Sequence, residues 1–254
     1  MTASDSFTVE QAAKAYGDLQ AVAPMSLRIK KGEVVALIGP SGAGKSTLLN
    51  MLAAIELPDA GTILLEDKAT SLYRNPKELA KKAGIIRQQF DLVSPLPVIH
   101  NVLAGKLADW GFWKSLWSFI FPQEKQTAMK ALERVGLSDK IYDRTSQLSG
   151  GEQQRVALAR LLVQNPEVIL ADEPVSSLDP ARAEDIIQIL VSLVKSENKT
   201  LVASLHSLDL AKTYFDRIIA LRNGQIFFDR KSAAITNEDL AQLYQLTERT
   251  QSAT

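Results

Sequence analysis

One short motif constrains the fold of this chain more than any other stretch. It follows the apolar run of residues 34–38, and its members are Gly39, Pro40, Ser41, Gly42, Ala43, Gly44, Lys45, Ser46 and Thr47. Their order fits G-x-x-x-x-G-K-[ST], the pattern of a phosphate-binding loop between a buried strand and a helix. The glycines let backbone N–H groups converge on phosphate oxygens, and the helix adds the positive end of its dipole. The motif therefore predicts a phosphate site in an α/β core.

Two side chains of this loop have the chemistry that a bound nucleotide requires. The Lys45 ammonium would reach the β- and γ-phosphates, and the Ser46 hydroxyl would complete the coordination of a Mg²⁺ ion between them. A merely flexible loop of glycine and serine is the alternative, and the flanking strand and helix argue against it.

Two adjacent carboxylates follow a second apolar run, residues 168–171. Asp172 at the tip of this strand would hold Mg²⁺ through water, and Glu173 could polarise an attacking water. Neighbouring residues on a strand point to opposite faces, so the two carboxylates need not share a role. The alternative is a pair of solvated acids, which four preceding apolar residues and the upstream phosphate loop make improbable.

A third candidate site is the start of a helix. Ser149 and Glu152 have the spacing of a capping box, and Gly150 and Gly151 lie between them. Exposed N–H groups, glycines and a hydroxyl at a helix start can bind an anion, although an ordinary helix cap has the same sequence.

Three further residues have both an ordinary structural interpretation and a functional one. Tyr16 precedes a turn, where position alone favours packing under a sheet over stacking on an adenine ring. Gln88 is one of two amides near the end of the predicted strand 85–90, where glutamine is most often a solvated turn residue. His206 follows the predicted strand 200–205, at the edge where ligands bind in parallel α/β sheets.

The remaining pattern predicts alternating strands and helices. We expect strands within residues 8–37 and at 62–66, a helix from 44 to about 56, and a hairpin over 217–228 with a type I′ Asn-Gly turn. Residues 100–147 read as helical and contain Trp110, Trp113 and Trp117 on one helical face. Core packing is the favoured interpretation of these tryptophans, and docking of another protein is the alternative. A short amphipathic helix with a polar end is expected after residue 231.

Composition excludes several classes of function. Lysine and arginine together number 29, as do aspartate and glutamate, so no basic excess points to nucleic acid. Cysteine is absent, which excludes disulfides and thiol chemistry and fits a reducing compartment. The polar N-terminus does not predict a signal peptide, and the most apolar stretch, residues 110–121, is too short to cross a bilayer.

Taken together, these motifs resemble those of the nucleotide-binding subunit of ABC transporters. The similarity runs from about residue 16 to residue 228. The phosphate loop, Gln88, the Leu-Ser-Gly-Gly-Glu signature at 148–152, the acidic strand end, the Ser-Leu-Asp turn at 177–179 and His206 follow one another in the family's order. The expected fold class is accordingly α/β, a P-loop NTPase RecA-like core with an antiparallel β subdomain and an inserted α-helical subdomain.

The resemblance implies roles within one subunit. Tyr16 would stack on adenine, which reverses the interpretation from position alone. Gln88 would touch Mg²⁺ and the attacking water and relay to the membrane subunit. Glu173 would be the general base, His206 would contact the γ-phosphate, and Lys45 would serve catalysis as well as binding.

The resemblance also implies a head-to-tail homodimer that holds two ATP molecules. Ser149, Gly150 and Gly151 would bind the γ-phosphate of ATP held by the second copy, and Asp179 would bridge the dimer. A single copy would then lack half of each site.

The expected domain division is residues 5–230 for the ATPase domain, with the helical subdomain over about 90–160, and residues 231–254 for a C-terminal helix and tail. Within the family the chain looks most like ATPases of bacterial phosphonate or phosphite importers. Two departures, Arg87 and His100, lie near the surface expected to meet the membrane subunit and bear on the identity of that partner.

We therefore expect an ATPase that uses ATP and Mg²⁺ to energise import of a small oxyanion such as a phosphonate or phosphite. It would lie at the cytoplasmic face of the inner membrane, bound to transmembrane permease subunits and indirectly linked to a substrate-binding protein. The alternatives are the ATPase of a lipoprotein or drug exporter, and a non-transport ABC ATPase that acts on DNA or ribosomes.

Overall fold

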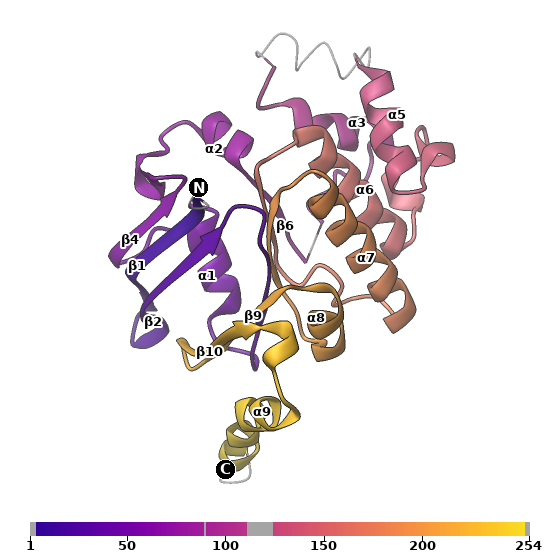
Figure 1. Cartoon of the computed structure of the whole chain (residues 1–254). Coiled ribbons are helices and arrows are strands. Elements are labelled where there is room, and N and C mark those ends of the chain that lie inside the picture. Colours follow the sequence, from indigo (N-terminus) through magenta and orange to yellow (C-terminus); the bar gives the residue numbers. More distant parts are fainter. Residues whose placement is uncertain (1–3, 89, 111–123, 252–254) are drawn as a thin grey trace.

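Two sheets form the framework of the molecule (Figure 1). The computed structural model describes residues 4–88, 90–110 and 124–251. The larger sheet has six strands in the order β10-β9-β3-β8-β7-β6, and the smaller sheet has four in the order β2-β1-β4-β5. All neighbours in the larger sheet are parallel except β9 and β10. Parallel strands joined by helices are the arrangement that the alternating sequence pattern predicts.

The strands of the larger sheet are short and mostly buried. Their bounds are β3 (Val34–Ile38), β6 (Ala83–Ile86), β7 (Val168–Ala171), β8 (Thr200–Ser204), β9 (Arg217–Arg222) and β10 (Gln225–Lys231). Every residue of β3, β7 and β8 is buried, as expected for parallel strands covered on both faces.

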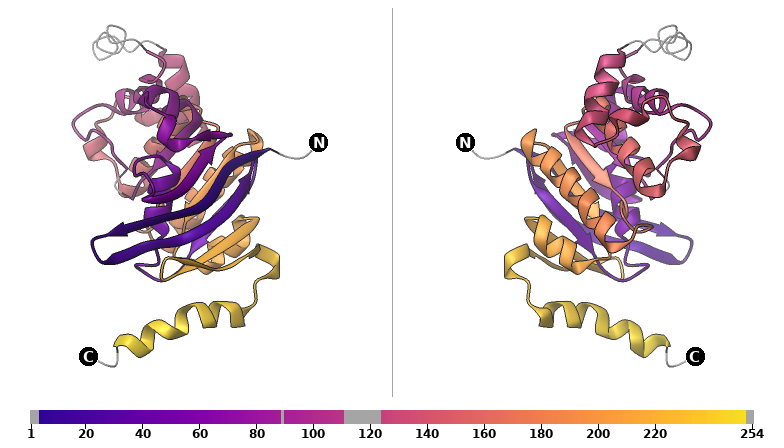
Figure 2. Two further views of the ribbon diagram at one scale, coloured as in Figure 1. Left: turned by 90° about the vertical axis from the view of Figure 1, so that its left-hand side faces the viewer. Right: turned by 90° about the vertical axis from the view of Figure 1, so that its right-hand side faces the viewer.

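The smaller sheet is antiparallel throughout and begins with a long hairpin. Its strands are β1 (Asp5–Tyr16), β2 (Leu19–Lys30), β4 (Ala60–Leu65) and β5 (Lys68–Ala69). The hairpin turn contains Gly17, and register shifts along β1 and β2 mark bulges that curve the pair. Figure 2 shows this curved hairpin along one side of the molecule.

Eight helices are labelled along the described chain. They are α1 (Lys45–Leu52), α2 (Pro76–Lys82), α3 (Val98–Leu103), α5 (Lys125–Arg134), α6 (Gly150–Gln164), α7 (Pro180–Ser196), α8 (Leu208–Tyr214) and α9 (Asn237–Gln251). Figure 2 shows α9 along the bottom of the molecule and the segment with α3 and α5 at the opposite end.

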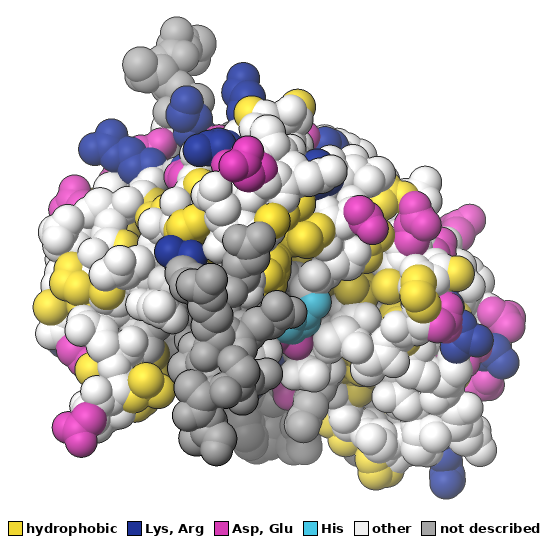
Figure 3. Space-filling view, turned by 90° about the horizontal axis from the view of Figure 1, so that it is seen from below, with side chains coloured by type: hydrophobic (Ala, Val, Ile, Leu, Met, Phe, Trp, Pro, Cys, Tyr) yellow, Lys and Arg dark blue, Asp and Glu magenta, His cyan; other side chains and the backbone are white. Residues whose placement is uncertain are grey.

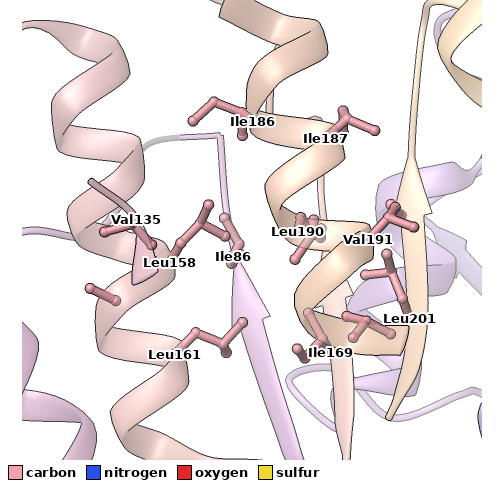
Figure 4. Close-up of a cluster of buried hydrophobic side chains, with 14 of the residues drawn as sticks. Ile86, Val135, Leu158, Leu161, Ile169, Ile186, Ile187, Leu190, Val191 and Leu201 are labelled. Carbon is pink, nitrogen blue, oxygen red and sulfur yellow. The ribbon is translucent and has the colours of Figure 1, made fainter. Parts of the chain in front are cut away.

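Two hydrophobic cores lie on the two faces of the larger sheet. Val34, Ala36 and Ile38 of β3 belong to the core shared with α6, α7 and α8, whereas Val35 and Leu37 belong to the core shared with α1 and the antiparallel sheet. The alternation follows from the two-residue period of a strand. Figure 4 shows the first core, where side chains of α6 and α7 meet those of β6, β7 and β8.

Several elements differ in extent from their prediction. Helix α1 ends at Leu52 rather than near residue 56, because Ala54 adopts a left-handed backbone conformation (φ 51°) that stops a helix. Strand β6 ends at Ile86, four residues before the predicted end, where its pairing with β7 stops. The type I′ turn is confirmed, since Asn223 and Gly224 both have positive φ, 51° and 73°.

Of the three tryptophans, Trp110 lies within the described residues. Trp110 is 3% exposed and belongs to the larger core, while its ring nitrogen donates to Glu124 at 3.3 Å. Trp113 and Trp117 lie outside the described residues. Core packing is therefore the outcome for Trp110.

An ion-pair network joins the antiparallel sheet to the back of the larger sheet. Glu66, which follows β4, pairs with Lys31 and with Lys82 of α2 at 2.6 Å, and Lys82 also pairs with Glu167 before β7 at 2.6 Å. Burial alone would raise the pKa of Glu66, but hydrogen bonds with these three neighbours outweigh burial and lower that pKa to about 2. The network therefore favours the folded state when Glu66 is ionised.

Acid should weaken this link between the sheets. A carboxylate with a lowered folded-state pKa stabilises the fold above its ordinary pKa of about 4.5, and the stabilisation is lost as the pH falls toward about 2. We expect Glu66→Gln to lower the free energy of unfolding at pH 7. The difference from wild type should shrink between about pH 4.5 and pH 2, measured by urea unfolding across that range.

Glu10→Gln is the matched control, because Glu10 lies on exposed β1 surface and makes no ion pair within the described chain. A difference between Glu66→Gln and wild type that stayed constant with pH would contradict the assignment.

Candidate active site

Close backbone contacts shape the phosphate loop. Gly39 and Gly44 adopt φ values of 148° and 97°, which favour glycine. A Cβ atom at Gly39 would lie 2.1 Å from the Leu221 carbonyl oxygen, and one at Gly44 would lie 2.4 Å from that of Ala21. These positions accept no larger residue without moving β9 or β2.

The β9–β10 turn ties the loop to the antiparallel sheet. The backbone N–H of Gly224 donates to the Ala43 carbonyl at 3.2 Å, and the Gly224 carbonyl accepts from Ala23 of β2 at 2.9 Å. Segments far apart in sequence therefore fix the loop. The first turn of α1 leaves backbone N–H groups without helical partners at the same point, where they can bind an anion.

Lys45 lies inside this loop. It is 5% exposed, and its ammonium donates to the carbonyl oxygens of Gly39 at 2.8 Å and Pro40 at 3.1 Å. Burial lowers the pKa of Lys45, while the nearby carboxylates of Glu173 and Asp172 act in the opposite direction. The geometry places this ammonium near both acidic residues.

Asp172 connects three elements of the core. One of its carboxylate oxygens accepts from the Ser46 hydroxyl at 3.0 Å and from the Ser204 hydroxyl at 2.8 Å. Ser46 belongs to α1 and Ser204 to β8, so the contact joins both elements to the end of β7. A hydroxyl and a carboxylate are hard oxygen donors of the kind that Mg²⁺ prefers, so this pair fits a magnesium ion bound with nucleotide phosphates.

The Glu173 carboxylate lies next to His206. Glu173 follows the end of β7 and has a left-handed φ of 47° immediately before a proline, a conformation that costs about 1 kcal/mol or more. Its backbone N–H donates to the Ser204 hydroxyl at 2.8 Å, and its carboxylate lies 2.5 Å from Nε2 of His206. The structure thus brings the predicted base and the predicted histidine together.

Tyr16 lies beside the phosphate loop, at the end of β1. It is 46% exposed, so the packing under a sheet that its position favoured is wrong. Its hydroxyl donates to Glu56, and this hydrogen bond followed by burial raises the pKa of Tyr16, while a hydrogen bond with Thr47 acts in the opposite direction. An exposed ring next to Thr47 remains available for stacking.

Gln88 is exposed and lies two residues beyond β6. The adjacent strand β7 carries Asp172, whose backbone N–H donates to the Ile86 carbonyl at 2.8 Å. The structure therefore puts Gln88 at the same edge of the sheet as Asp172 and Glu173, without a side-chain hydrogen bond to either among the described contacts.

The signature residues lie elsewhere in the subunit. Ser149 caps α6, and its capping box with Glu152 is confirmed. Gly150 and Gly151 face the start of α7, where added Cβ atoms would lie 3.9 Å from Leu178 and 3.7 Å from Arg182. Asp179 caps α7 and pairs with Arg182 at 3.2 Å. In the described residues, no hydrogen bond joins this group to the phosphate loop of the same chain.

The family described as ABC transporter matches residues 22–176, a segment that contains the phosphate loop, the signature and the acidic strand end. The chain belongs to the ABC transporter family.

Close relatives of this ABC protein cover nearly its whole length. A Nostoc relative named Phosphonates import ATP-binding protein PhnC 1 is 42% identical, over 96% of this chain and 94% of its own. The Escherichia coli O157:H7 relative named Phosphonates import ATP-binding protein PhnC is 42% identical, over 95% of each chain.

Solved ABC cassettes share the fold. A structure described as the dimeric post-hydrolysis state of the ATP-binding cassette MJ0796 bound to ADP and Pi is 31% identical. It covers 90% of this chain and all of its own, with a TM-score of 0.75. The expected P-loop α/β fold class is thereby confirmed.

No helix in the described part of this ABC protein is both long and apolar enough to cross a membrane. On the face seen from below, hydrophobic side chains occur in several separate clusters, and most of the charged side chains lie toward the rim (Figure 3).

Ser204 is a residue of this site that the sequence did not predict. This residue is fully buried at the end of β8, and its hydroxyl bonds both the Asp172 carboxylate and the backbone N–H of Glu173. The available signal was a hydroxyl at the end of a largely apolar strand, two residues before His206. Its partners became visible only when β7 and β8 were paired.

Ser204→Ala should lower kcat for ATP hydrolysis about tenfold, because the two acidic residues lose a shared contact that fixes their positions. Stability should fall by about 1 kcal/mol. Steady-state kinetics with urea unfolding would measure both effects.

Ser6→Ala is the matched control. Ser6 is 2% exposed and bonds Thr200 at 2.7 Å, at the opposite end of β8. We expect a similar loss of stability with little change in kcat. Equal losses of kcat in the two variants would argue against a positioning role for Ser204.

Proposed function

We propose that this chain is the ATP-hydrolysing subunit of an ABC importer that takes up a phosphonate or a similar small oxyanion. The observation that carries the proposal is the convergence of Lys45, Asp172, Glu173 and His206 at one edge of the parallel sheet. Ligands bind at this edge in open α/β sheets.

The residues support in-line attack of water on the γ-phosphate. Lys45 and the backbone N–H groups of the loop hold the phosphates, and Tyr16 stacks on adenine. Glu173 accepts a proton from the attacking water, and His206, 2.5 Å from it, orients that carboxylate and faces the γ-phosphate. Gln88 contributes a further polar contact at the same edge.

Ser46 and Asp172 are the residues that would hold Mg²⁺, with Gln88 nearby. The ion would neutralise charge that develops on the phosphate oxygens. The Ser46 and Asp172 oxygens already lie 3.0 Å apart beside the phosphate loop, so both would be at hand for an ion bound there.

A second copy of the chain completes the proposed site. Ser149 and Gly150 are exposed at the start of α6 and Gly151 is buried next to them, and none of the three makes a described contact with the phosphate loop of its own chain. They are free to meet ATP held by a partner, with Asp179 beside them. The dimeric cassette among the similar structures supports this arrangement.

A groove between α2, β6 and α6 is the proposed seat for a permease helix. It encloses about 490 Å³, and Ile55, Leu79 and Leu107 provide apolar lining, with Arg87 and Asp91 at 3.6 Å from each other at one end. Ile55 and Leu107 are 46% and 41% exposed and line the same groove, so they offer apolar surface that a partner helix would cover. Docking here would place the chain at the cytoplasmic face of the membrane, with a substrate-binding protein on the other side.

The importer assignment and the substrate class rest on the relatives, which are named for phosphonate import. Nothing among them favours the exporter or non-transport alternatives. We also propose that residues 5–230 form the ATPase domain, with a helical subdomain near 90–160, and that residues 231–254 form a C-terminal helix and tail.

Glu173→Gln should lower the rate of ATP hydrolysis at least about a hundredfold, because the amide cannot accept the proton of water. ATP binding, measured by equilibrium titration, should persist. Glu167→Gln at the opposite end of β7 is the control and should keep its turnover. Unchanged turnover in Glu173→Gln would sink the proposed mechanism.

The partner is tested by isolating the tagged chain from its native membranes and identifying bound proteins by mass spectrometry. We expect a permease together with a phosphonate-type binding protein. Leu107→Asp in the groove should abolish this association, whereas Leu19→Asp, at a 68% exposed leucine on β2, should keep it. An exporter-type permease, or none, would overturn the importer assignment while leaving the ATPase.

A further inference from the structure

Arg160 holds the segment that follows Gln88. Its guanidinium nitrogens donate to the carbonyl oxygens of Asp91 at 2.7 Å and Phe90 at 2.8 Å. Both acceptors are backbone atoms, so the contact fixes the path of the chain rather than one side chain. Bonds from a charged donor are about twice as strong as neutral ones.

The Arg160 side chain is half-buried beside the groove. Burial lowers the pKa of Arg160, and the Asp91 carboxylate acts weakly in the opposite direction. The Asp91 carboxylate itself lies toward exposed Arg87, at 3.6 Å. The two carbonyl oxygens are therefore the close partners that offset the burial of this cation.

Arg160 belongs to α6, the helix that starts at the signature residue Ser149. One turn further on, Gln164 donates to the carbonyl oxygens of Ala80 at 2.7 Å and Ala83 at 3.4 Å. One face of α6 therefore holds the start of β6 through Gln164 and the segment beyond its end through Arg160. Both side chains also border the groove described above.

We propose that Arg160 is a positioning residue for ATP hydrolysis, which acts through Gln88 by fixing the backbone at Phe90 and Asp91. A shift of α6, or of the residues that line the groove, would then move Gln88 relative to Asp172 and Glu173. This inference rests on the proposed function, in which Gln88 contributes to the reaction.

A purely structural role makes a different prediction. If Arg160 only stabilised the fold, its loss and the loss of the Gln88 amide would act independently on turnover. If Arg160 acts through Gln88, removing the amide first should leave little for Arg160 to contribute.

The first experiment is a double-mutant cycle on the full-length chain, with kcat for MgATP hydrolysis as the readout. We expect Arg160→Ala to lower kcat between about tenfold and a hundredfold, since small misplacements of a catalytic group have effects of this size. Arg160→Lys, which can reach one carbonyl, should be intermediate. In the Gln88→Ala background either change should cost no more than about twofold.

Gln164→Ala is the matched control, because it removes a tether from the same helix to the opposite end of β6. Its effect should multiply with that of Gln88→Ala. Thermal melting first establishes that each variant folds. If Arg160→Ala does not fold, Arg160→Lys replaces it in the double-mutant cycle.

Hydrogen–deuterium exchange gives a second readout that is independent of activity. The peptide that contains Phe90 and Asp91 should exchange faster in Arg160→Lys than in wild type and should be unchanged in Gln164→Ala. Multiplicative effects in the Arg160 cycle, or unchanged exchange in this peptide, would overturn the inference while the proposed ATPase stands. Loss of the ATPase assignment would appear instead as unchanged turnover in Glu173→Gln.

Discussion

A single carboxylate oxygen of Asp172 is the contact on which the active-site edge depends. It accepts hydrogen bonds from Ser46 and Ser204, and so links α1, the end of β7 and the end of β8. The Ser204 hydroxyl also accepts a hydrogen bond from the backbone N–H of Glu173, which has a left-handed conformation. The Glu173 carboxylate in turn lies next to His206. The Ser204 hydroxyl thus contacts both Asp172 and the backbone of the proposed base, while Ser46 is held by Asp172 itself.

The parallel sheet makes this concentration of polar groups possible. Its strands β3, β7 and β8 are buried on both faces, so in these strands polar side chains are tolerated only at the ends. The phosphate loop reaches the same edge because Gly39 and Gly44 approach the carbonyls of neighbouring strands more closely than any other residue could. Lys45 is buried there at a cost that two backbone carbonyls and two nearby carboxylates offset.

Helix α6 connects parts of the molecule that have separate roles in the proposed cycle. Its first residues offer the signature to a second copy, its middle holds the segment after Gln88, and its last turn holds the start of β6. A rigid helix transmits a displacement at one end to the other, since its side chains are packed in the larger core. Binding of a permease in the groove and hydrolysis at the strand ends would in this way be mechanically related.

The sequence by itself determined the phosphate loop, the capping box at Ser149 and the Asn223-Gly224 turn, because each depends on neighbours within a few residues. The alternation of apolar runs with helical patterns indicated a parallel core, whereas the order of its strands was set by distant pairings such as that of β3 with β8. It also supplied the candidate residues through their family order. Only the tertiary structure decided that Tyr16 is exposed and that Ser204 joins Asp172 to Glu173. It likewise decided that Arg160 reaches the backbone after Gln88, a contact across about 70 residues of sequence. Local patterns report local backbone preferences, whereas the partner of a lone buried hydroxyl or guanidinium depends on which strands and helices become neighbours.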